Sequence, residues 1–97
     1  MNFLQPTFIR QVRAARSILG WSQKDLAARS GVSLSTLNRL ERGDGDSSVH
    51  SLRMIQATFE QAGIQFINNP DGSIGVVLSA KGLADGKRDG SVVGSES

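Results

Sequence analysis

Residues 21–43 constrain the fold of this 97-residue chain more than any other stretch. Ser22 and Asp25 stand three residues apart, which is the spacing of a capping box at the start of a helix. Gly31 lies where a left-handed residue would end that helix. The pattern therefore predicts a short helix over residues 23–30.

A second short helix is predicted directly after the first. Ser33 can cap it, Leu37 and Leu40 recur at helical spacing and face inward with Val32, and Gly43 ends it. Two helices that meet across a tight turn have the layout of a DNA-binding helix-turn-helix, in which the second helix enters the major groove.

The stretch resembles the Xre-type helix-turn-helix family, whose members are similar to the phage lambda-repressor and Cro proteins. The resemblance extends from about residue 8 to residue 63 and implies a transcriptional regulator that binds double-stranded DNA. The matching residues are Arg16, Gly20-Trp21-Ser22-Gln23, Leu26-Ala27, Gly31-Val32-Ser33, Leu37 and Leu40-Glu41-Arg42-Gly43.

The second helix of the motif carries side chains suited to reading bases. Ser35 lies three residues before Asn38 and four before Arg39, so all three share one face. Arg can fork onto guanine, Asn can pair with adenine, and Ser can bond to either. Leu34 is an apolar residue outside the core stripe, and it is either a contact to a thymine methyl or an ordinary exposed leucine.

The first turn of the preceding helix is a second expected point of contact with DNA. Backbone N–H groups at a helix N-terminus attract phosphate, and the Gln23 amide can add a hydrogen bond there. The resemblance implies the same role for Gln23. The complete set of expected DNA contacts is Gln23, Ser33, Leu34, Ser35, Asn38, Arg39 and Arg42.

Arg16 stands next to an apolar stripe, where a cation is costly unless it is paired. The family resemblance supplies Glu41 as its partner, so we expect a partly buried ion pair with a structural role. Arg13 is interpreted as part of a solvated helix face, with a phosphate contact as the alternative.

Two further helices are predicted around the motif. Thr7 can cap the first helix, which runs to Leu19 after a frayed arm over residues 1–6, and Ser48 can cap the last. Trp21 is expected to form a lid over the core. The inward residues are Phe8, Val12, Ala15 and Leu19 in the first helix and Val49, Leu52, Ile55 and Phe59 in the last.

Beyond Gly63 the apolar pattern changes to the alternation of strands, with turn residues between two segments. The fold class is thus mainly α, a four-helix lambda-repressor-like domain (1–63) followed by a β-hairpin (64–78) and a flexible tail (79–97). An isolated hairpin is marginal in water and has open edges, so we expect it to form the dimer. The residues expected to do so are Ile64, Phe66, Val76, Val77 and Leu78.

The amino-acid composition limits which kinds of binding site and which cellular location are expected. The chain has no Cys and one His, His50, so it offers no thiolate or multi-histidine metal site, and we expect no metal or cofactor. No leader or membrane span is recognised, and a cytoplasmic protein without a membrane partner is expected. The net charge of +2 is concentrated in residues 1–63, which carry eight basic and five acidic side chains.

Two functional hypotheses follow. The first is a homodimeric, sequence-specific regulator on a palindromic operator, most simply a repressor or autoregulator. The alternative is an antitoxin-like or antiactivator module that neutralises a toxin or activator as its protein partner. An enzyme is not expected, because no catalytic constellation or strand-linked phosphate loop is present.

Overall fold

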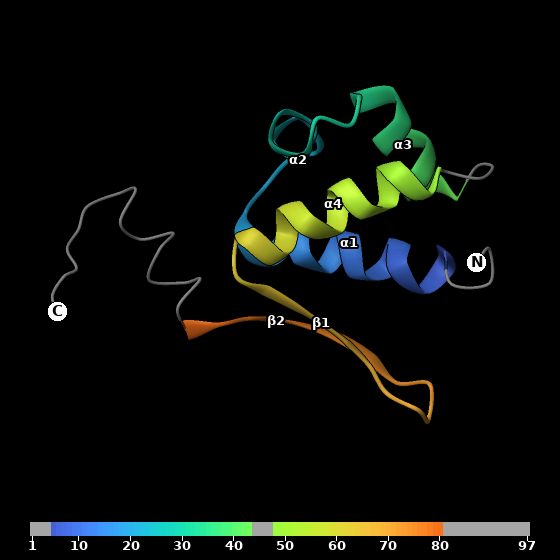
Figure 1. The fold of residues 1–97 in the computed structure, drawn as a ribbon, viewed down its shortest axis with the longest axis vertical. Helices are drawn as coiled ribbons and strands as arrows, with labels where there is room; N and C mark the ends of the chain where they lie inside the picture. Colours follow the sequence, from blue (N-terminus) through green and yellow to red (C-terminus); the bar gives the residue numbers. More distant parts are fainter. Residues whose placement is uncertain (1–4, 44–47, 81–97) are drawn as a thin grey trace, which may run out of the picture.

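Four helices and a two-stranded hairpin follow one another along the chain (Figure 1). The computed structural model describes residues 5–43 and 48–80. The helices are α1 (Gln5–Leu19), α2 (Gln23–Ser30), α3 (Leu34–Arg42) and α4 (Val49–Gln61), and the strands are β1 (Ile64–Asn68) and β2 (Ile74–Leu78). The predicted mainly α fold with a C-terminal hairpin is confirmed. Most of the predicted flexible tail, residues 81–97, and residues 1–4 of the predicted arm lie outside the described ranges.

Helix α1 begins earlier than the sequence predicts. It starts at Gln5 and includes Pro6 and Thr7, so Thr7 is not its cap. Proline is tolerated in the first turn of a helix, where its missing N–H has no intrahelical acceptor. The helix ends at Leu19, and Gly20 follows it with a φ of 72° that is readily adopted only by glycine.

The ends of α2 and α3 are fixed by neighbouring residues. The Asp25 N–H donates to Ser22 Oγ at 3.0 Å, and the Ser22 N–H donates to Asp25 Oδ2 at 2.9 Å, which completes the predicted capping box. Gly31 and Gly43 end the two helices with φ values of 81° and 76°. Local chemistry thus determines where each helix of the motif starts and stops.

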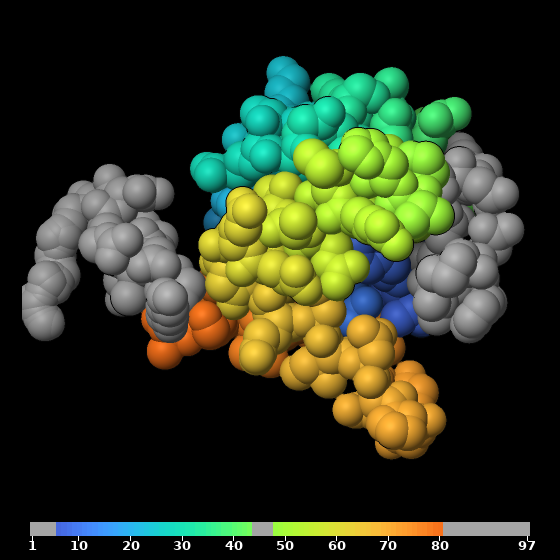
Figure 2. Space-filling model, viewed as in Figure 1, coloured from blue at the N-terminus to red at the C-terminus, as the bar shows by residue number. Residues whose placement is uncertain are grey.

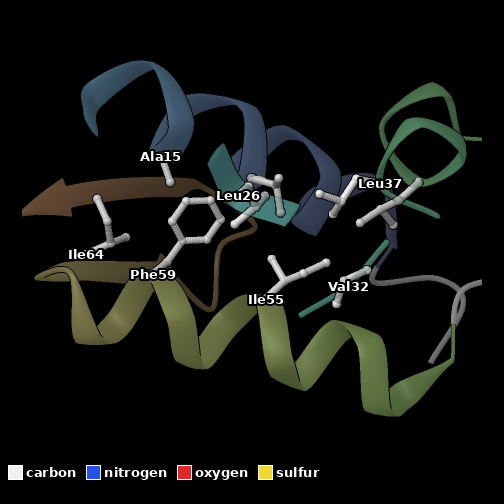
Figure 3. Packing of buried hydrophobic residues seen from close by; sticks show 9 residues of the cluster. Ala15, Leu26, Val32, Leu37, Ile55, Phe59 and Ile64 are labelled. Atoms are coloured by element: carbon white, nitrogen blue, oxygen red, sulfur yellow. The ribbon is translucent and has the colours of Figure 1, made fainter. Parts of the chain in front are cut away.

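One apolar core joins the four helices to the hairpin (Figure 3). Phe59 of α4 is its largest fully buried side chain, and the ring stacks on Trp21 at 5.6 Å between centroids. This contact confirms Trp21 as a lid. The buried hydrophobic residues are Val12, Ala15, Leu26, Val32, Leu37, Leu40, Ile55, Phe59 and Ile64.

Val49 does not belong to this core, so the inward position predicted for it is wrong. Its side chain is 51% exposed, whereas Ile55 is fully buried. Val49 is the first residue of α4, and that end of the helix extends past Val32 and Ile55 (Figure 3). Helical spacing identifies the inward face of a helix, but not how far along that face the core reaches.

The hairpin packs on the opposite side of the α1–α4 layer from α2 and α3 (Figure 1). Its strands pair antiparallel, with Phe66 opposite Val76 and Ile67 opposite Gly75. The Phe66 ring lies 5.7 Å from that of Phe8 and 6.1 Å from that of Phe59. The loop end of the hairpin stands clear of the helices (Figure 2).

A buried amide joins α1 to the hairpin. Gln11 is 3% exposed, and its Nε2 donates to the carbonyl oxygens of Ile67 and Gly75, each at 3.1 Å. Those two residues face each other across the strands, so one side chain holds both strands to α1. No pattern in the sequence predicts this role for Gln11.

Candidate nucleic-acid interface

Helix α3 has one buried face and one exposed polar face. Leu37 is fully buried and Leu40 is 2% exposed, and both belong to the core. Ser35, Asn38 and Arg39 are exposed to solvent. The structure therefore places these three hydrogen-bonding side chains together on the outward side of the second motif helix, where base edges could be reached.

The residues at the two ends of α3 differ in what they can offer to DNA. The Ser33 hydroxyl caps the helix by accepting from the Thr36 N–H at 3.2 Å, and it donates to Thr36 Oγ1 at 2.8 Å. Leu34 is 36% exposed, and Arg42 is exposed in the last turn. Ser33 therefore caps the helix, whereas Leu34 has no capping role.

The N-terminus of α2 forms the second part of the surface. Gln23 is its first residue, and its side chain is half-buried. The Asp25 N–H is occupied by Ser22, whereas the backbone N–H groups of Gln23 and Lys24 have no acceptor among the residues that the structure describes. Such unpaired donors, at the positive end of the helix dipole, suit a phosphate group.

The capping box at this end also perturbs a carboxyl group. The Ser22 backbone N–H, and then the Ser22 hydroxyl, lower the pKa of Asp25 below its ordinary value of 3.8. Each of these hydrogen bonds favours the charged carboxylate. Asp25 is therefore an anion at neutral pH and keeps the first turn of α2 closed.

The motif is fastened to α1 by a two-pronged ion pair. Arg16 Nε lies 2.9 Å from Glu41 Oε2, and Arg16 Nη2 lies 2.8 Å from Glu41 Oε1. Arg16 also donates to the Trp21 carbonyl at 3.0 Å. Glu41 is 4% exposed and Arg16 21%, so the guanidinium and the carboxylate, which the sequence analysis pairs, meet largely out of water. Bidentate geometry of this kind fixes orientation as well as distance.

Arg13 makes a further contact to the same glutamate. It donates to the backbone carbonyl of Glu41, and its Nε lies 3.8 Å from Glu41 Oε1. From its sequence pattern Arg13 is expected to be solvated or to contact a phosphate, and no contact with Glu41 is predicted. The available signal is its position three residues before Arg16, because residues three apart share a helix face.

Arg29 packs against the Trp21 ring. Its guanidinium carbon is 4.5 Å from the centre of the Trp21 ring, and Trp21 in turn stacks on Phe59. A cation above an indole face is attracted to the ring electrons. Arg29 thus covers the lid of the core.

The five hairpin residues predicted to form a dimer occupy different environments. Ile64 is 2% exposed and belongs to the core of its own chain. Phe66, Val76 and Leu78 are half-buried against that core, whereas Val77 is 42% exposed. Of the five side chains, only that of Val77 is directed mainly away from the protein's own interior.

No group of three or more His, Cys, Asp or Glu side chains that could hold a metal ion occurs within residues 5–43 and 48–80. In the same ranges, no helix is long and apolar enough to cross a bilayer. Exposed hydrogen-bonding side chains on α3 and open N–H donors at the start of α2 are thus available to a ligand.

Comparison with known proteins agrees with this geometry. No curated protein matches the chain. The model of the helix-turn-helix family HTH_3 matches residues 10–60, which is more than half of the 97 residues. The match includes all of α2 and α3 and ends before the hairpin. The chain therefore belongs to the HTH_3 helix-turn-helix family of DNA-binding regulators.

Proposed function

We propose that this protein is a sequence-specific transcriptional regulator that acts as a homodimer on a palindromic operator, most simply as a repressor or autoregulator. Residues 1–63 would act as the DNA-binding domain and residues 64–78 as the dimerisation element. The observation that carries the proposal is the exposed face of α3, where Ser35, Asn38 and Arg39 stand opposite the buried Leu37 and Leu40.

The roles of the side chains follow from their chemistry. Arg39 forks onto a guanine edge, Asn38 pairs with an adenine or another base edge, and Ser35 bonds to a base or phosphate. Leu34 offers its methyl groups to thymine. Gln23 and the open N–H groups of α2 hold a phosphate and set the register of the protein on the duplex.

A dimer is supported by the form of the hairpin. A two-stranded sheet has an open edge on each strand, and natural proteins cover or block such edges. Two copies joined by a twofold axis would present two α3 helices to half-sites about one helical turn apart. A palindromic operator follows from that symmetry.

The readout can be tested with a duplex selected from a random pool by the wild-type protein and a scrambled duplex of equal length. Arg39→Ala should weaken binding to the selected duplex by about 1–3 kcal/mol and weaken binding to the scrambled duplex much less. Gln23→Ala should weaken both by similar factors. Fluorescence anisotropy at each of two salt concentrations measures the six affinities of the wild-type protein and the two variants for the two duplexes.

Arg53→Ala is the matched control, because Arg53 is an exposed arginine on α4, outside the motif. It should leave the preference between the two duplexes unchanged. Equal losses on both duplexes for Arg39→Ala would make Arg39 a phosphate contact. If the wild-type protein selects no sequence at all, the antitoxin-like or antiactivator hypothesis becomes the better one.

A further inference from the structure

The free edge of β2 can be defined from the hydrogen bonds of the hairpin. The Ser79 N–H donates to the Gly63 carbonyl at 2.8 Å, and the Asn69 N–H donates to the Ser73 carbonyl at 2.9 Å. In an antiparallel ladder, pairs that exchange hydrogen bonds alternate with pairs that do not. Gly75 and Val77 therefore turn their backbone groups toward β1.

The other residues of β2 turn their backbone groups the opposite way. These outward N–H and C=O groups belong to Ile74, Val76 and Leu78, and they have no backbone partner among the residues that the structure describes. The strand sequence, Ile-Gly-Val-Val-Leu, contains no charge. Charged side chains commonly protect an edge strand from pairing, and β2 has none.

We propose that β2 pairs antiparallel with β2 of a second copy of the chain, with the twofold axis at Val76. This inference rests on the proposed homodimer and specifies which edge joins the two copies and in which register. Val76 would face Val76 of the second copy, and Ile74 would face Leu78 of the second copy. All these residues have outward backbone groups, so the two strands can exchange hydrogen bonds along their full length.

The side chains of β2 are complementary to themselves in this register. Ile74 is 37% exposed, and it would lie beside Leu78 of the second copy on the face that covers the helices. Val77, 42% exposed, would lie opposite Gly75 of the second copy. A Cβ built on Gly75 meets nothing within 4 Å, so there is open space for that valine.

The edge of β1 is a poorer candidate for the same pairing. Its first residue, Ile64, is 2% exposed, and the Phe66 ring is held between Phe8 and Phe59. Its exposed residues, Gln65 and Asn68, are polar. Apolar surface left open to water is therefore concentrated on β2.

Pairing through β2 is compatible with DNA binding. The hairpin and α3 lie on opposite sides of the α1–α4 layer, so a second copy on the hairpin would leave the exposed face of α3 open (Figure 1). Gln11 fixes β2 to α1 through the Gly75 carbonyl. Joining two β2 strands would thus also set the position of one α3 helix relative to the other.

Engineered disulfides can test the register, because the chain contains no cysteine. Gly75→Cys and Val77→Cys are made separately in the full-length protein, one with an affinity tag, and then mixed under mild oxidation. Opposite residues in a pair without hydrogen bonds have Cα atoms about 4.5 Å apart, within disulfide range. We expect the mixed pair to cross-link at least about tenfold faster than either variant alone, whose like positions lie beyond the roughly 7 Å limit.

Gln65→Cys mixed with Gly75→Cys is the matched control, because Gln65 lies on β1, one strand further from the proposed axis. It should not cross-link above background. Sedimentation of the wild-type protein accompanies the test. A dimer in which the mixed Gly75→Cys and Val77→Cys variants link no faster than this control would overturn the register and leave the proposed homodimer standing. If the wild-type protein is a monomer both free and bound to DNA, the β2–β2 pairing and the proposed homodimer are both overturned.

Discussion

The α2–α3 unit and the β1–β2 hairpin pack on opposite sides of the same helical layer, but they are specified in different ways (Figure 1). Each motif helix is bounded by a serine cap and a left-handed glycine within a few residues of its own ends. The hairpin depends on Gln11, which lies 56 and 64 residues before the two carbonyls it bonds. The difference teaches that the ends of the motif helices are set by adjacent residues, whereas the attachment of the hairpin to the helices uses a side chain distant in the sequence.

The largest expected effect comes from breaking the buried ion pair that joins α3 to α1. Glu41→Gln leaves Arg16 partly buried without its carboxylate and weakens the Arg13 contact. The free energy of unfolding should fall by about 2–4 kcal/mol, as for other buried pairs that lose one partner. Urea denaturation measures the change, and the folded variant should still bind DNA.

Glu60→Gln is the matched control, because Glu60 is exposed. Within the described residues its carboxylate accepts one hydrogen bond, from Gln56 Nε2 at 3.1 Å. It should alter stability by no more than about 0.5 kcal/mol. An unchanged melting temperature for Glu41→Gln would show that α3 needs no ion pair beyond its caps and the core packing of Leu37 and Leu40.

A smaller and more local effect is expected at the hairpin. Gln11→Leu keeps the side-chain volume but removes the two hydrogen bonds to Ile67 and Gly75, at a cost of about 1–2 kcal/mol. Hydrogen exchange followed by NMR should speed up for the amides of β1 and β2 and stay nearly constant for those of α3. Equal acceleration of amide exchange in the hairpin and in α3 would contradict a role of Gln11 that is confined to the hairpin.

Gln65→Leu provides the control for that experiment. Gln65 is exposed on β1 and has no hydrogen bond from its side chain within the described parts of the chain. The same chemical change there should leave exchange in both strands close to that of the wild-type protein. A similar acceleration in the two variants would mean that added apolar surface, and not the lost amide, loosens the hairpin.

The smallest effect concerns two carboxyl groups, one in each region. Hydrogen bonds from Ser22 lower the pKa of Asp25, and the Ser73 hydroxyl followed by its N–H lowers the pKa of Asp71. Since each folded-state pKa lies below the ordinary value of 3.8, the associated stability is present above that value. It is lost as the pH falls through the lowered pKa of each folded-state carboxyl.

NMR titration of the carboxyl carbons checks both the sign and the independence of the two sites. Ser22→Ala should raise the pKa of Asp25 toward 3.8, because the hydrogen bond from the Ser22 hydroxyl is lost. The pKa of Asp71 should stay unchanged. A wild-type pKa for Asp25 at or above 3.8 would contradict the capping-box assignment. A shift of Asp71 in the same variant would show that the two regions are coupled.

Sequence alone predicts the helical part of the fold well for a physical reason. The signals that end α2 and α3 are single residues with strong backbone preferences, such as Ser33 at a cap or Gly31 and Gly43 at left-handed positions. The strands are likewise visible from alternation. The core position predicted for Val49 is wrong because periodicity reports direction around a helix and not distance along it.

The tertiary partners could not be obtained in the same way. Gln11 and Arg13 look like ordinary polar residues of an amphipathic helix, and the groups they contact lie in α3 and the hairpin. Alternation in β2 places Ile74, Val76 and Leu78 on the face that covers the helices, but it cannot reveal that Ile74 stays exposed while Val76 is half-buried. The pairing of Arg16 with Glu41 is predictable because a family resemblance carries three-dimensional information that one sequence lacks.

The position of Trp21 gives the protein a built-in optical reporter. It is the single tryptophan of the chain, which has no tyrosine, so excitation at long ultraviolet wavelengths selects one ring. That ring lies between the Arg29 guanidinium and the Phe59 ring and borders the shared core. Its emission should therefore follow the packing of α2 against α4 during unfolding, without any label on the surface proposed to bind DNA.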